Sequence, residues 1–193
     1  MEKTFIEVGS CDFNTLNNLA DEGWKGFIID PMEKYLNNIP KKEGVHYLPL
    51  AIDHTKGERL IYHAKDSQVD LDRDWAGMST FLPKDKRRWG HSLKDPTVDL
   101  LGCELLIKTD TFRNIIEEYN IESIDFLKID TEGYDFEIIK SFPWENEPLK
   151  PSIIKCEIDK LRYLHKVEIK KYLEKRSYHV YLEEHDLYAI KLR

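Results

Sequence analysis

Acidic side chains recur at the ends of the apolar segments of this sequence, and they are the first residues that could do chemistry. The acids placed in this way are Glu7, Asp30, Asp53, Asp130, Glu132 and Glu157. The carboxyl ends of parallel strands open into one crevice, where α/β proteins bind their ligands. If these segments are parallel strands, the acids gather around one pocket, and an acid-lined pocket suits a cationic ligand.

The pair Gly9 and Asp30 indicates a nucleoside ligand. A glycine after the first strand permits a tight turn and a close approach of the backbone to a ligand. Asp30 lies 21 residues after Gly9, and an acid about 20 residues after such a turn can accept both hydroxyls of a ribose. The alternative is that Asp30 only caps a helix that Pro31 opens, and one side chain can serve both purposes.

The loop that begins at Gly9 separates two classes of nucleoside cofactor. It reads Gly-Ser-Cys-Asp-Phe-Asn rather than GxGxxG, and the charge of Asp12 would repel a pyrophosphate. S-adenosylmethionine has no phosphate and carries a sulfonium and an ammonium cation. The loop therefore favours S-adenosylmethionine over a nicotinamide dinucleotide.

Asp130 and Glu132 stand at a sharp turn and are the candidate catalytic groups. A neutral hydroxyl is a poor nucleophile, so its methylation benefits from a positioned base. The alternative is that both acids only interact favourably with the dipole of the helix that follows. We favour the base role for Asp130 and leave that of Glu132 open. A lone histidine is usually structural or solvated, so His54, His91 and His165 rank behind Asp130.

Strand-like and helix-like segments alternate along the chain, which predicts a parallel sheet with crossover helices. The expected strands are 5–9, 26–30, 46–53, 58–64, 103–109, 125–130, 152–158, 179–184 and 187–192. The fourth and fifth of these are expected to pair at a sheet edge, and the last two to form an antiparallel hairpin. The expected helices lie around 16–20, 32–39, 112–119, 133–142 and 160–176.

Residues 65–100 are polar and broken by glycine and proline, which predicts a long irregular loop or lid. Its basic part, 83–94, is by the commoner interpretation a solvated surface. As a substrate lid, its arginines would bind an anionic group of the acceptor. Trp75 or Trp89 would stack on a sugar.

The composition predicts a single globular domain over residues 1–193, with 41% hydrophobic and 34% charged residues. A net charge of −7 argues against a nucleic-acid substrate, because phosphate contacts need a basic surface. Three widely spaced cysteines and the lack of a signal peptide or membrane span indicate a cytoplasmic location. Acid-rich strand ends alone do not establish a metal site, so none is predicted. The oligomeric state stays open, with a homodimer as one option.

Several segments, taken together, resemble a known family. LKIDTEGYDFEIIKSF (Leu127 to Phe142) is similar to the signature segment of the FkbM-type methyltransferases. FIEVGSCDFNTL and GFIIDPMEKYL resemble the first two cofactor motifs of that family. LAIDHTKG is similar to its third-strand segment and GMST (77–80) to a short Gly/Ser motif. The motifs follow the family's order over nearly the whole chain.

The resemblance implies a class I methyltransferase fold, which is Rossmann-like and doubly wound. Such a fold has a mostly parallel seven-stranded sheet with a C-terminal antiparallel hairpin. The resemblance also implies S-adenosylmethionine as cofactor and O-methylation of a hydroxyl on a sugar or another small molecule.

The motifs also imply a set of cofactor-binding residues. This set is Glu7, Gly9, Ser10, Asp12, Asn14, Asp30, Pro31, Ile52, Asp53, Ser79 and Asp130. Glu7, Gly9 and Asp12 would line the methionine end, Asp30 would hold the ribose, and residues 52–53 would flank the adenine.

The chain departs from the family at Phe13, where many relatives carry a second glycine. Two other functions stay open from the sequence. One is a Rossmann-type nicotinamide-dependent oxidoreductase, against which the missing GxGxxG speaks. The other is a non-catalytic nucleoside-binding module, against which the intact Asp30 and Asp130 speak.

Overall fold

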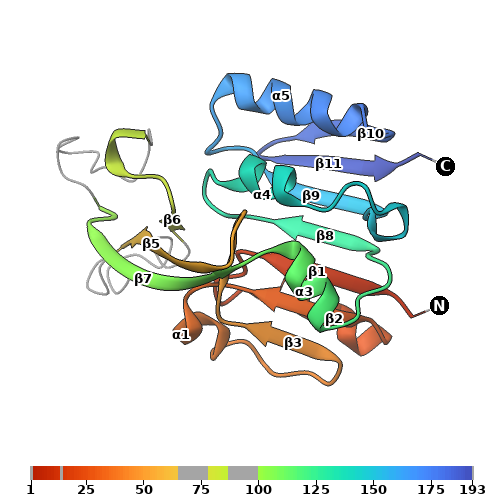
Figure 1. The fold of residues 1–193 in the computed structure, drawn as a ribbon, viewed down its shortest axis with the longest axis horizontal. Helices are drawn as coiled ribbons and strands as arrows, with labels where there is room; N and C mark the ends of the chain where they lie inside the picture. Colours follow the sequence, from red (N-terminus) through yellow and green to blue (C-terminus); the bar gives the residue numbers. More distant parts are fainter. Residues whose placement is uncertain (1, 14, 65–77, 87–99, 193) are drawn as a thin grey trace.

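The largest element of the structure is a seven-stranded sheet with the strand order β10-β11-β9-β8-β1-β2-β3 (Figure 1). The computed structural model describes residues 2–13, 15–64, 78–86 and 100–192. Five strands run parallel, and β11 pairs antiparallel with both β9 and β10. The strands are β1 (Thr4–Val8), β2 (Lys25–Ile29), β3 (Val45–Leu48), β8 (Phe126–Ile129), β9 (Ile153–Glu157), β10 (Tyr178–Glu183) and β11 (Asp186–Lys191). The α/β class expected from the sequence is confirmed.

Both faces of this sheet are covered. Successive side chains of a strand point to opposite faces, and those of β1 belong to two different buried clusters. Ile6 and Val8 belong to a buried cluster that includes residues of α3, α4 and α5. Phe5 belongs to a separate cluster with Leu16 and Leu36, on the side of η1 and α1. None of the helices in the described part of the chain has the length and apolar character needed to cross a bilayer. The helices are η1 (Asn17–Glu22), α1 (Glu33–Leu36), η3 (Lys84–Lys86), α3 (Phe112–Glu118), α4 (Asp135–Ser141), η4 (Glu147–Leu149) and α5 (Tyr163–Glu174).

A second sheet of four strands, in the order β4-β7-β5-β6, stands at the carboxyl ends of the parallel strands (Figure 1). All of β5 pairs antiparallel with β7. We call this pair the β5–β7 arm. The strands of this sheet are β4 (Ala51–Ile52), β5 (Gly57–His63), β6 (Ser79–Thr80) and β7 (Cys103–Asp110).

Two sequence-based expectations for this region are wrong. The single strand expected over 46–53 is divided between the two sheets, because β3 ends at Leu48 and β4 begins at Ala51. Pro49 lies in the break and has no amide hydrogen to continue a strand ladder. The strands expected at 58–64 and 103–109 do pair with each other, but they build the second sheet rather than an edge of the first.

Two other segments are shorter or more ordered than expected. The helix expected over 32–39 is reduced to α1, and the chain continues to Ile39 in turns. Within the expected loop 65–100, the described residues contain β6 and η3. The remaining residues, 65–77 and 87–99, lie outside the described part of the chain.

The strand order changes direction at β1 and β8, with β2 and β3 on one side and β9 on the other. Ligands of open α/β sheets bind at such a switch point. Gly9 follows β1 directly with a φ of 79°, and a Cβ atom there would lie 1.8 Å from the carbonyl oxygen of Asp130. Only glycine allows the two central strand ends to come this close.

We expect Gly9→Ala to lower the free energy of unfolding by about 3 kcal/mol or more, because a clash adds to roughly 1–2 kcal/mol of left-handed backbone strain. Urea unfolding followed by circular dichroism measures this change. The matched control is Gly23→Ala, which has a φ of 80° but no atom within 4 Å of the added methyl group. Gly23→Ala should show the smaller, strain-only loss, and equal losses for both variants would contradict the close approach.

Candidate active site

A pocket lies at the carboxyl ends of β1, β2, β4 and β8, and β5 and β6 of the second sheet contribute to its wall. Apolar side chains such as Ile61, Phe81 and Ile138 form much of the lining. Six residues that the sequence assigns to the cofactor also line it: Gly9, Asp30, Pro31, Ile52, Ser79 and Asp130. The structure therefore brings together assigned residues that are far apart in the sequence.

Asp30 lies at the end of β2 and is almost fully buried. One carboxylate oxygen accepts the backbone N–H of Cys11 at 2.8 Å, and the other accepts that of Met32 at 2.8 Å. Burial raises the pKa of Asp30 to about 6, although these two hydrogen bonds oppose the shift. Asp30 therefore holds the loop after β1 and caps the turn before α1 while it also faces the pocket.

Glu7 and Lys128 form a buried ion pair next to Asp130, which lines the pocket. They are register neighbours on β1 and β8, and their side chains are 0% and 6% exposed. The Lys128 Nζ atom lies 3.0 Å from Glu7 Oε1 and 3.4 Å from Asp130 Oδ2. Burial lowers the pKa of Lys128, but the two carboxylates outweigh it and raise the pKa above its ordinary value. Neither Glu7 nor Lys128 lines the pocket, and the ion pair is connected to the lining by the contact of Lys128 with Asp130.

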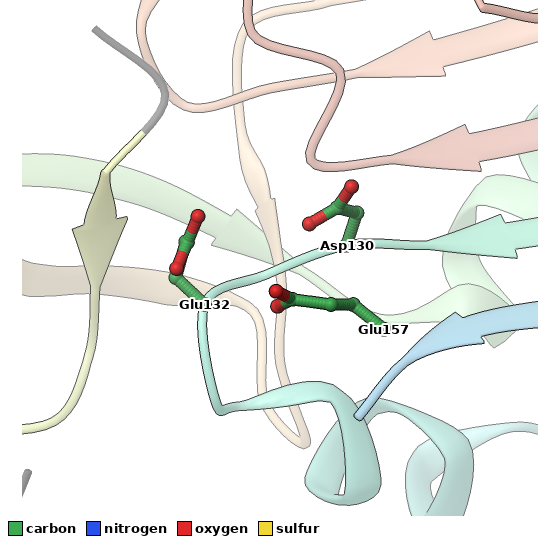
Figure 2. A group of neighbouring side chains, drawn as sticks. All are labelled: Asp130, Glu132 and Glu157. Carbon is green, nitrogen blue, oxygen red and sulfur yellow. The ribbon is translucent and has the colours of Figure 1, made fainter. Parts of the chain in front are cut away.

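Three carboxyl groups gather beside the pocket at the turn after β8. Figure 2 shows Asp130, Glu132 and Glu157 with their carboxyl groups directed toward a common space. One oxygen of each lies within 4.8 Å of the others. Glu132 has a φ of 53°, in the left-handed region that non-glycine residues rarely adopt. We call these three residues the carboxyl cluster.

Two members of the carboxyl cluster hold protons at neutral pH. Burial raises the pKa of Glu132 to about 8 and that of Glu157 to about 9, and the neighbouring acids raise both further against the opposing charge of Lys160. One oxygen of Glu132 and one of Glu157 are buried without a hydrogen-bond partner. The cluster can therefore exchange protons with a bound molecule, and the three acids alone do not establish a metal site.

Asp53 lies behind the pocket wall and does not line the pocket. Its carboxylate accepts hydrogen bonds from the Tyr134 hydroxyl at 2.9 Å and from Arg59 Nη1 at 2.8 Å. These partners and the backbone N–H of His54 occupy both carboxylate oxygens. The role beside the adenine that the sequence suggests for Asp53 therefore stays a prediction, and its observed contacts are with the wall.

Several other sequence-assigned residues lie away from the pocket lining. Ser10 is buried and its hydroxyl contacts the carbonyl of Cys11, and Asp12 accepts a hydrogen bond from Asn38. Neither of these two assigned residues lines the pocket. Residues expected in the cofactor loop or the lid that lie outside the described part of the chain are Asn14, Trp75, Arg87, Arg88, Trp89 and His91.

The two described histidines that were considered as bases do not line the pocket. His54 Nε2 lies 3.5 Å from the Glu137 carboxylate and is half-exposed. The His165 ring lies 6.1 Å from the Phe136 ring. Asp130 lines the pocket and neither of these histidines does, so the base role of Asp130 stays a prediction.

Sequence reasoning missed Lys128 and Arg59. A signal for Lys128 exists, because it is a lone charge between apolar residues in the strand segment FLKI. Arg59 gives no such signal, because it lies in a segment of mixed polarity and its partners are 6 and 75 residues away.

We expect Lys128→Met to lower the free energy of unfolding by about 3–5 kcal/mol, because Glu7 would remain buried without a counter-charge. The double variant Glu7→Gln/Lys128→Met should recover much of this loss, since it removes both charges. Urea unfolding measures both variants. Lys25→Met is the control, because it removes an exposed pair with Glu2 at 2.8 Å and should change stability by about 1 kcal/mol or less. Similar losses for Lys128→Met and Lys25→Met would rule out the buried pair.

The pKa values of Glu132 and Glu157 predict a stability that falls as the pH rises. Both are raised from an ordinary value of 4.5, so the folded state binds more protons than the unfolded state above that pH. Their contribution is fully present below about pH 4.5 and is lost as the pH rises through about 8 and 9. Unfolding in urea at a series of pH values should show a smaller fall for Glu157→Gln than for the native protein. An identical pH dependence would show that Glu157 is ionised at neutral pH.

No curated protein sequence matches the chain. The N-terminal domain of human METTL16 in complex with SAH has a similar structure, with a TM-score of 0.43 and 11% sequence identity. That similarity covers 100% of this chain and 63% of the METTL16 chain, so this chain spans less than two thirds of it. The human methyltransferase 10 domain containing protein gives a TM-score of 0.43 at 11% identity, with 98% and 71% covered.

The sequence profile of the methyltransferase FkbM domain matches residues 7–180. This range begins in β1 and ends in β10, so it includes Gly9, Asp30 and Asp130 at the pocket. Because the profile covers most of the chain and all of these strand ends, the chain belongs to the FkbM methyltransferase family, and its cofactor is S-adenosylmethionine.

Proposed function

We propose that the protein transfers a methyl group to a hydroxyl of a sugar or another small molecule. The observation that carries this proposal is the position of Asp130, which lines the pocket and also belongs to the carboxyl cluster. A hydroxyl must lose its proton when it is methylated, and a carboxylate beside the pocket can accept that proton. The proposal includes the class I methyltransferase fold, which the strand order of the large sheet supports.

The residues at the pocket fit S-adenosylmethionine by their chemistry. The glycine at position 9 keeps side-chain atoms out of the space between the central strand ends. Asp30 offers a buried carboxylate for the ribose hydroxyls, and Ile52 offers an apolar contact for the adenine ring. Asp130 supplies negative charge for a cationic ligand. When bound, S-adenosylmethionine supplies a methyl group activated by the positive charge on its sulfur.

The three acids of the carboxyl cluster differ in protonation state, and the roles that we propose for them differ accordingly. Glu132 and Glu157 are protonated at neutral pH and cannot accept a further proton. Asp130 forms an ion pair with Lys128, so it is the group that accepts the hydroxyl proton of the acceptor. Glu132, which the sequence suggests as a second catalytic group, then serves as a proton donor or a neutral hydrogen-bonding group.

The pocket also bears on the two alternative functions. Its acidic groups suit a sulfonium ligand better than the pyrophosphate of a nicotinamide dinucleotide. A non-catalytic nucleoside-binding module would use Asp30 but would have no need for a base at Asp130. Methyl transfer, rather than binding alone, is therefore the function that we propose.

Incubation with S-adenosylmethionine labelled on its methyl carbon tests this function directly, with sugars, sugar phosphates and phenols as acceptors. We expect a labelled product that resists mild alkali, as a methyl ether does, because the acceptor is a hydroxyl. A methyl ester would release labelled methanol under the same treatment. Asp130→Asn should lower the transfer rate by about 10²–10⁴-fold, because the base is lost, while binding of S-adenosylhomocysteine changes little.

The control for this variant is Asp125→Asn at the other end of β8. The Asp125 carboxylate accepts the backbone N–H of Thr4 at 2.9 Å, far from the pocket lining. This variant should keep the native transfer rate. An alkali-labile product would contradict hydroxyl methylation, and an unchanged rate in Asp130→Asn would exclude Asp130 as the base. Binding of the nucleoside without any transfer would favour the non-catalytic module.

A further inference from the structure

We propose that Arg59 on the β5–β7 arm is a positioning residue for the cofactor pocket, because it holds the aromatic wall formed by Phe81 and Tyr134. The inference rests on the proposed use of this pocket by S-adenosylmethionine. It makes the second sheet a working part of the cofactor site. It also explains why Asp53 is buried behind the wall and does not line the pocket.

The hydrogen bonds of Arg59 connect three segments, and the segment of Tyr134 is 75 residues away in the sequence. Its Nη1 atom donates to Asp53 Oδ2 at 2.8 Å and to the Tyr134 hydroxyl at 2.8 Å. The Tyr134 hydroxyl in turn donates to Asp53 Oδ1 at 2.9 Å. Arg59 belongs to β5, Asp53 follows β4, and Tyr134 lies in the turn between β8 and α4. This closed triangle ties the large sheet to the arm.

The guanidinium group of Arg59 also packs against the rings that face the pocket. Its central carbon lies 4.1 Å from the centre of the Phe81 ring and 5.0 Å from that of Tyr134. The two rings meet edge to face with their centres 5.0 Å apart. Both residues are buried and both line the pocket. One cation therefore fixes the position of two aromatic rings by stacking and by hydrogen bonding.

Arg59 and Asp53 each stabilise the charged form of the other. Burial alone would raise the pKa of Asp53, but Arg59, Tyr134 and the His54 amide hold it below its ordinary value. The pKa of Arg59 is raised above its own ordinary value because Asp53 and Tyr134 outweigh its burial. Without Arg59, a buried carboxylate would lose its counter-charge directly behind the wall.

The ion pair of Lys56 and Asp110 near the β5–β7 arm provides a comparison, because it lies outside the pocket lining. Lys56 Nζ lies 2.8 Å from Asp110 Oδ2, the same distance as in the Arg59 pair, and Asp110 is as buried as Asp53. Neither Lys56 nor Asp110 lines the pocket. The Lys56 pair therefore serves as a matched control, because it ties the same region together without touching the wall.

Isothermal titration calorimetry with S-adenosylhomocysteine and with adenosine tests the proposal, and unfolding in urea runs in parallel. We expect Arg59→Met to weaken the binding of both ligands by about tenfold or more, because the wall loses its hydrogen bond and its stacking cation. Arg59→Lys, which keeps a charge near Asp53, should recover part of this loss. Lys56→Met should leave both affinities at the native level even where it lowers stability.

A double-variant cycle shows whether Arg59 acts through the wall. Tyr134→Phe removes the hydroxyl and keeps the ring, and it should weaken binding in the same direction as Arg59→Met. Because the two residues act on one wall, the double variant Arg59→Met/Tyr134→Phe should lose less binding free energy than the sum of the losses in the two single variants. Additive losses, or native affinity in a folded Arg59→Met protein, would overturn the positioning role. If the native protein binds neither nucleoside, the proposed function itself fails together with the inference.

Discussion

A single buried cation, Lys128, supports the arrangement of charges on which the pocket depends. Removing an amine from water costs several kcal/mol, and here contacts with two carboxylates offset that cost. One of them, Glu7, uses its second oxygen to hold the backbone N–H of Leu16, so the same interaction also fixes the loop after β1. The other, Asp130, lines the pocket. Lys128 thus supports both parts of the site. It holds the loop after β1 through Glu7, and it holds Asp130 at the pocket directly.

The acidic groups at the pocket favour a positively charged ligand. Asp30 and Asp130 face the pocket, and Glu132 and Glu157 lie beside it in protonated form. A sulfonium donor carries a positive charge on sulfur that the product nucleoside no longer has. In the proposed reaction, the carboxylates of Asp30 and Asp130 would attract the donor more strongly than the product, which would favour exchange of one for the other after transfer. Additional ionised acids would repel each other in this space, and proton uptake by two of them avoids that cost.

The sequence reveals the convergence of Gly9, Asp30 and Asp130, because each follows an apolar strand and parallel strands end at one edge. It does not reveal the partners of those residues. Whether an acid faces the ligand or the interior depends on the face of the strand and on distant partners. Asp53 is an example: it stands at a strand end, but its carboxylate accepts hydrogen bonds from Arg59 and Tyr134. The expected strand over 46–53 fails for a related reason, since the chain changes sheets within it and apolar patterning is the same in both.

The second sheet sets the geometry on both sides of the site. Through Arg59 it holds the Tyr134 ring, and through β6 it holds the turn in which Glu132 lies, because Thr80 Oγ1 donates to the Glu132 carbonyl at 3.0 Å. The left-handed backbone at Glu132 costs about 1–3 kcal/mol and persists only where surrounding contacts enforce it. Glu132 of the carboxyl cluster and Tyr134 of the aromatic wall lie in the same short turn, residues 131–134. A movement of the second sheet would therefore displace both residues, so the carboxyl cluster and the aromatic wall are mechanically coupled.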